Sequence, residues 1–97
     1  EALEGQGFSV FVFEGVLEGG ATGLFDNVDA GRPPLVMVSD DGVLHHYCLV
    51  LGYDPPAGHV VLLDPRRGRV VLPVETFERD WGRSNRFTLL ATPRAGA

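Results

Sequence analysis

Residues 45–64 read HHYCLVLGYDPPAGHVVLLD, and this stretch decides the fold. Two runs rich in β-branched and aromatic residues, 45–52 and 58–64, flank a segment with two prolines, which is the pattern of a β-hairpin. If Gly52 pairs with Gly58 across a five-residue loop, His46 lies directly opposite Asp64. We therefore expect these two side chains to be opposite each other, or one pair away, on the same face of a sheet.

The rest of the chain predicts further strands and two short helices around this hairpin. The first helix is expected to start with Thr22 as its cap and to stop at Gly31, and the second to start at Pro73 with Val74, Phe77 and Trp81 on one face. The other expected strands are 8–13, 35–39, 69–72 and 86–92. The fold class is therefore α+β, a curled antiparallel sheet of four to six strands with two short helices. Most strands are apolar on both faces, so we expect the sheet to be covered on both sides.

Composition and charge exclude several function classes. The net charge is −5 and all eight basic residues are Arg, spread without a basic stripe, so nucleic acid is not an expected partner. The longest apolar runs are too short to span a membrane, so any membrane association would come through segments outside residues 1–97. Residues 1–97 are expected to form a single domain. Glu1–Gly5 is typical of a helix end with a Gly stop, which indicates that the chain was cut from a longer one.

A paired imidazole and carboxylate can form part of a nucleophilic catalytic site. If Asp64 accepts the Nδ1 proton of His46, it fixes the tautomer and leaves Nε2 free as a base. The residues alone also allow a structural interpretation, in which Asp64 before Pro65 is an Asx-turn residue and His46 is a surface residue at a strand start. Both interpretations stay open on the hairpin alone.

The single cysteine is a weak candidate for the nucleophile. Cys48 lies two residues from His46 on the same strand, and alternate residues of a strand are about 6.5–7 Å apart, too far for a direct hydrogen bond. We expect a buried core thiol with a raised pKa. One cysteine also excludes an intrachain disulfide and leaves the redox compartment undecided.

The remaining candidate residues favour structural roles. A zinc site from His45, His46 and His59 would need side chains that the strand alternation points apart, so no metal is expected. Phe77 and Trp81 are predicted to anchor the second helix in the core. The turn arginines are interpreted as solvated charges, with contact to a substrate carboxylate as the lesser alternative; they are Arg66, Arg67 and Arg69.

The order of short motifs resembles the bacteriocin-processing, papain-like bacterial cysteine peptidases and their stand-alone relatives. The family pattern is Gly-Arg-Pro, His-aromatic leading to Gly-Tyr, Asp-Pro-x-x-Gly, and Phe-x-x-x-Trp. In this chain it corresponds to Gly31-Arg32-Pro33, His46-Tyr47 to Gly52-Tyr53, Asp64-Pro65 with Gly68, and Phe77 with Trp81. The resemblance covers about residues 7–93 with order and spacing kept. It implies that His46 is the general base, that Asp64 orients it, and that no metal or organic cofactor takes part.

The resemblance also marks what these 97 residues lack. The family's nucleophilic Cys opens a helix in an N-terminal half, after a Gln of the oxyanion hole, and Gln6 has no Cys at the matching spacing. This chain therefore resembles the C-terminal half alone, and the missing half becomes its expected partner beside a peptide or protein substrate. The face bearing His46 and Asp64 is then expected to be partly uncovered. The relatives are bacterial and often exported or membrane-associated, while the sequence itself indicates no compartment.

Three functions remain open at this stage. The first is a cysteine peptidase domain completed by the missing half. The second is a non-catalytic, peptidase-like module that binds peptide or protein substrates, for example for a secretion system. The third is a structural β-domain, in which the proximity of His46 and Asp64 would have no function.

Overall fold

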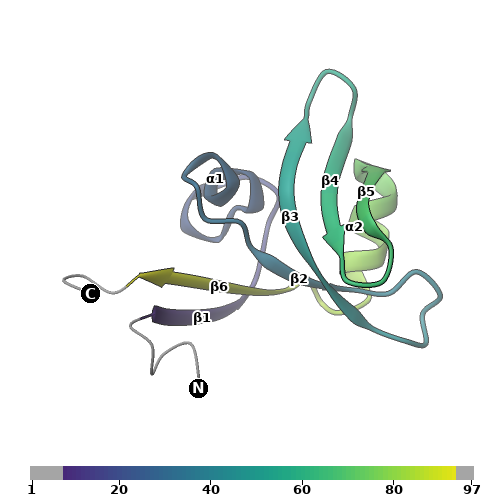
Figure 1. The fold of residues 1–97 in the computed structure, drawn as a ribbon, viewed down its shortest axis with the longest axis horizontal. Helices are drawn as coiled ribbons and strands as arrows, with labels where there is room; N and C mark the ends of the chain where they lie inside the picture. Colours follow the sequence, from purple (N-terminus) through teal and green to yellow (C-terminus); the bar gives the residue numbers. More distant parts are fainter. Residues whose placement is uncertain (1–7, 94–97) are drawn as a thin grey trace.

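The computed structural model of the chain describes residues 8–93, so the helix end expected at Glu1–Gly5 lies outside the described residues. Six strands, two α-helices and one turn of 3-10 helix follow one another along the chain (Figure 1). They are β1 (Phe8–Glu14), η2 (Gly20–Thr22), α1 (Leu24–Asp29), β2 (Leu35–Val38), β3 (His46–Asp54), β4 (His59–Asp64), β5 (Gly68–Pro73), α2 (Val74–Gly82) and β6 (Phe87–Pro93).

The strands form one antiparallel sheet in the order β1-β6-β2-β3-β4-β5. Three of them, β3, β4 and β5, are consecutive in the chain and form a meander. The other half of the sheet is built differently, because β6 lies between β1 and β2 (Figure 1). The α+β class, the curled sheet of six strands and the two short α-helices confirm the prediction.

The central hairpin forms, but its register differs from the expected pairing. Asp54 pairs with His59, so the loop has four residues, Pro55 to Gly58, rather than five. Gly58 closes the turn with φ of 68°, a conformation that glycine adopts without a steric penalty. A β-bulge at Leu51 then adds one residue to β3, and Leu49 pairs with Leu63. Continued along the strands, this register places His46 one pair away from Asp64 on the same face.

One face of the sheet carries the hydrophobic core. The amphipathic stripe of α2 packs on it as predicted, with Phe77 and Trp81 fully buried and Val74 at the margin. The two aromatic rings are stacked with centroids 5.3 Å apart, and Trp81 Nε1 donates to the carbonyl of Phe87 at 3.2 Å. The core is completed from α1 and the three middle strands by Leu24, Phe25, Val36, Val38, Cys48, Val50, Val60 and Leu62.

The first helix starts later than the sequence suggested. Thr22 belongs to η2, and Gly23 is the N-cap of α1, with no side-chain capping bond. The carboxylate of Asp26 instead reaches back to accept hydrogen bonds from the backbone N–H groups of Gly19 and Gly20, at 2.8 and 2.6 Å. The predicted cap is wrong because the Asp26 side chain, inside the helix, accepts the backbone N–H groups of the loop that precedes it.

The helices cover the face of the sheet that we expected to be partly open, the face that bears His46 and Asp64. Both α-helices pack over the face that carries Cys48, Val50, Val60 and Leu62, all of them buried. Among residues 8–93, no α-helix packs on the other face, so the expected cover on both sides is also wrong. That outer face carries an apolar row across five strands, formed by Val12, Leu89, Leu35, Leu49 and Leu63. Neither helix of residues 8–93 is long and apolar enough to cross a membrane.

Candidate active site

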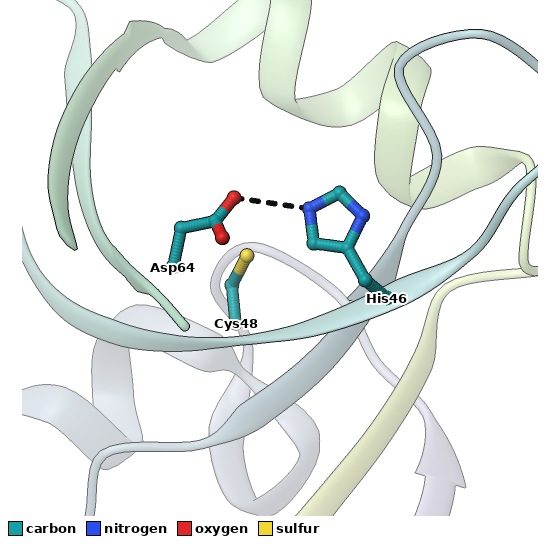
Figure 2. A group of neighbouring side chains, drawn as sticks. All are labelled: His46, Cys48 and Asp64. Carbon is teal, nitrogen blue, oxygen red and sulfur yellow. Dashed lines mark hydrogen bonds and ion pairs between the residues drawn. The ribbon is translucent and has the colours of Figure 1, made fainter. Parts of the chain in front are cut away.

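His46 and Asp64 meet on the core face, where β3 begins and β4 ends. His46 Nε2 lies 3.0 Å from Asp64 Oδ2 (Figure 2). The Asp64 side chain is fully buried, while the His46 side chain keeps 16% of its surface exposed. The predicted proximity on one face is confirmed, and the pair sits at the margin of the core, where the imidazole can still be reached from solvent.

The tight turn after β4 fixes the Asp64 carboxylate. Its Oδ1 accepts the backbone N–H of Arg66 at 2.8 Å, and its Oδ2 accepts Arg67 Nε at 3.1 Å. The first contact is an Asx turn, so the structural and the functional interpretation of Asp64 hold together: one oxygen builds the turn and the other faces His46. The turn closes where Asp64 pairs with Gly68, whose φ of 78° suits glycine.

These contacts keep Asp64 ionised. Burial alone would raise the pKa of this carboxyl group, but the hydrogen bonds from the Arg66 backbone, Arg67 and His46 outweigh it and lower the pKa to about 2. At neutral pH a buried carboxylate therefore faces the imidazole.

The ring nitrogens have exchanged the roles that we expected. Nε2, not Nδ1, faces Asp64, and Figure 2 shows the second ring nitrogen of His46 pointing away from the carboxylate. With the Nε2 proton donated to Asp64, the free lone pair lies on Nδ1. The base of this pair would therefore be Nδ1, on the side of the ring remote from Asp64.

Cys48 lies beneath the pair as a core residue. It is 1% exposed, and burial, together with the negative charge of Asp64, raises the pKa of its thiol to about 11. The side chain is thus a neutral thiol at physiological pH, as predicted from its place in an apolar strand. Its sulfur is nevertheless near the pair: the donor atoms of His46, Cys48 and Asp64 all lie within 4.8 Å of one another.

The other two histidines do not join this group. His45 Nε2 lies 3.3 Å from the backbone carbonyl of Arg83, and His59 pairs with Asp54 at the far end of the hairpin. The divergence of the three histidines agrees with the strand alternation. Of the turn arginines, Arg67 has a role that the sequence analysis missed, and its position three residues after Asp64 in a Gly-terminated turn is the signal that could have revealed it.

A second missed feature is the ordered loop between β2 and β3, which leads directly into His46. Asp41 Oδ1 accepts the backbone N–H groups of Val43 and Leu44 at 2.8 and 2.9 Å. Ser39, fully buried, accepts Gly42 N–H through its hydroxyl at 2.9 Å, and its carbonyl accepts Arg83 at 2.9 Å. The loop therefore holds two strongly exposed apolar side chains, Val43 and Leu44, close in sequence to His46.

The chain matches no protein-family profile and no curated protein sequence. Its fold is similar to that of two solved bacterial peptidase structures. A predicted C39-like peptidase from Bacillus anthracis superposes with a TM-score of 0.67 at 18% identity, over 90% of this chain and 52% of that one. The peptidase domain of Streptococcus mutans ComA gives 0.66 at 20% identity, over 96% and 70%.

These similarities establish the fold. The architecture is that of C39-like, bacteriocin-processing peptidase domains, which agrees with the motif resemblance. The chain spans about half the length of the Bacillus anthracis chain.

Proposed function

We propose that this chain is the His/Asp half of a papain-like cysteine peptidase domain, a single domain that hydrolyses peptide bonds once a Cys-bearing N-terminal half completes it. The observation that carries the proposal is the 3.0 Å contact between His46 and a buried, ionised Asp64. The C39-like fold supports it, because it makes this contact part of a peptidase architecture rather than an isolated pair.

The chemistry follows from the orientation of the imidazole. Nδ1 of His46 would take the proton of the incoming Cys thiol, and the thiolate would attack the carbonyl carbon of a peptide. His46 would return that proton to the amine as the C–N bond breaks, and would then activate a water that hydrolyses the thioester. Asp64 would hold Nε2–H throughout and stabilise the imidazolium between the two proton transfers.

Extending the chain by its upstream coding sequence tests the proposal. The 97-residue chain alone should not cleave peptides, and a protein extended by the upstream coding sequence with its Cys should. In the extended protein, His46→Ala should lower kcat/KM by several orders of magnitude, because Cys and His act as a unit. Asp64→Asn should lower it less, since the base remains. His45→Ala is the matched control, a neighbouring histidine turned away from the pair, and should cleave at the wild-type rate.

Two outcomes would contradict the assignment. Equal cleavage with and without His46 would show that His46 is not the base. An extended protein that binds peptides but never cuts them would favour the peptidase-like binding module, whose partner would be a peptide or protein ligand.

A further inference from the structure

Three different metal-binding side chains converge under the proposed active site. They are the imidazole of His46, the thiol of Cys48 and the carboxylate of Asp64, and Figure 2 shows them directed toward a common point. Two of them, His46 and Cys48, lie on alternate residues of β3, and the third arrives from the end of β4. The peptidase mechanism uses His46 and Asp64 but gives no role to Cys48.

We propose that His46, Cys48 and Asp64 form an inhibitory zinc site. Imidazole nitrogen, thiolate sulfur and carboxylate oxygen are the donors that Zn²⁺ prefers, and three protein ligands with one open position are a common arrangement around a zinc ion that can exchange its fourth ligand. The inhibitory effect rests on the proposed function, whereas the binding of the metal does not.

The separations of the donor atoms suit one ion. Zn–S and Zn–N bonds are about 2.3 and 2.1 Å long, so two ligands of one tetrahedral zinc lie about 3.6 Å apart. The donor atoms here lie within 4.8 Å of one another, and Nε2 and Oδ2 are 3.0 Å apart. Side-chain rotations that move the donor atoms by up to about 1.2 Å would bring all three onto one tetrahedral ion. The His46 side chain keeps 16% of its surface exposed, so the three donors lie at the margin of the core next to solvent.

Zinc binding would remove the free lone pair by which His46 acts as a base. When the ion takes the Nε2 lone pair, the imidazole proton must sit on Nδ1, where it blocks the lone pair that the peptidase needs. The Cys48 thiol loses its proton to solvent as the Zn–S bond forms, so one proton is released for each zinc bound. Zinc would therefore inhibit without touching the nucleophile of the other half.

The Arg67 guanidinium would compete with zinc for the carboxylate of Asp64. Its Nε lies 3.1 Å from Oδ2 of Asp64, the same oxygen that faces His46. A guanidinium there repels a divalent cation and occupies a lone pair that the ion would use. Removing it should therefore tighten zinc binding, an effect that a merely structural role of Arg67 would not produce.

The test uses the folded 97-residue chain with zinc chloride in competition with a chromophoric chelator, and cobalt(II) as a spectroscopic substitute. We expect one zinc per chain and a thiolate-to-cobalt charge-transfer band. Cys48→Val should remove that band and weaken zinc binding by more than about 10-fold, since even the loss of an outer-shell partner costs about 10–100-fold. Arg67→Ala should strengthen binding, and His45→Ala and His59→Ala should leave it unchanged. Circular dichroism confirms that each variant is folded.

Equal zinc affinity in the wild type and in folded Cys48→Val, or a cobalt complex without the charge-transfer band, would overturn the proposal. Loss of binding in His45→Ala or His59→Ala would also overturn it, because it would show adventitious surface coordination. These readouts do not use cleavage, so their failure is distinct from failure of the peptidase assignment.

Discussion

Replacing Trp81 with Ala is the sharpest test of how α2 holds the sheet. Trp81 is fully buried, stacks on Phe77, and donates a hydrogen bond to the Phe87 carbonyl at the start of β6. It also lies so close to Gly15 that a Cβ added there would come within 2.8 Å of its ring. Truncation of a buried aromatic side chain costs about 3–5 kcal/mol. Against a total stability of about 5–15 kcal/mol, this change removes a fifth of the stability or more.

The assay is urea unfolding followed by far-UV circular dichroism, since the variant loses the only tryptophan of the chain. Trp81→Phe is the matched variant that keeps an aromatic ring but not the N–H donor, and it should fall between wild type and Trp81→Ala. Phe11→Ala removes a half-exposed aromatic side chain from β1 and should cost far less. A loss below about 1 kcal/mol in Trp81→Ala would refute the packing argument, because no fully buried tryptophan is that dispensable.

Two further predictions concern the site residues. Because the pKa of Asp64 is lowered from 3.8 to about 2 in the folded chain, its carboxylate stabilises the fold above its unfolded pKa, and this contribution is lost as the pH falls through about 2. The stability difference between wild type and Asp64→Asn, measured by urea unfolding, should therefore shrink between about pH 5 and pH 2, and a difference that does not change with pH would contradict the assignment. Cys48, whose thiol pKa is raised to about 11 by burial first of all, should resist iodoacetamide at neutral pH in the folded chain and react once urea unfolds it, as followed by mass spectrometry; rapid labelling of the native chain would show that the site opens.

The sequence predicted the elements well because their signals are local. The β-rich runs and the turn residues mark six strands, and the spacing of Val74, Phe77 and Trp81 marks the buried side of α2. The face shared by His46 and Asp64 was also predictable. Strand alternation keeps the two side chains on one face whenever the register shifts by two residues.

The register and the side of the sheet were not predictable, for physical reasons. The bulge at Leu51 adds a residue without any signal of its own, and it changes the alternation so that Tyr53 turns to the core side and stacks on Phe25 at 4.1 Å. Alternation likewise tells which residues share a face but not which face the helices cover. The open face was assigned to the side with His46, whereas the stripe of α2 is wide enough to bury that side.

The ring orientation of His46 depends on how far Asp64 lies along the hairpin, which the pattern of residue types in the sequence does not show. Asp64 lies one pair along the hairpin instead of directly opposite, so the carboxylate reaches the far nitrogen, Nε2, rather than Nδ1. Arg67 was missed for a related reason, because its contact with Asp64 depends on the shape of a turn and not on a periodicity.

The position of β6 between β1 and β2 has a consequence for how the chain is made. Among the described strands β1 pairs only with β6, its partner at the opposite end of the segment. On the ribosome, β1 is therefore synthesised before the other described strands and has no partner until β6, the last of them, emerges, while β2 keeps one edge unpaired for the same time. At this stage β1 and the edge of β2 that β6 will cover are both unpaired and carry apolar side chains, a state prone to associate with other chains. Slow translation near the end of the segment would prolong that exposure, so yield should respond to the codons of β6 more than to those of the β3–β4–β5 meander, which can close as it is made.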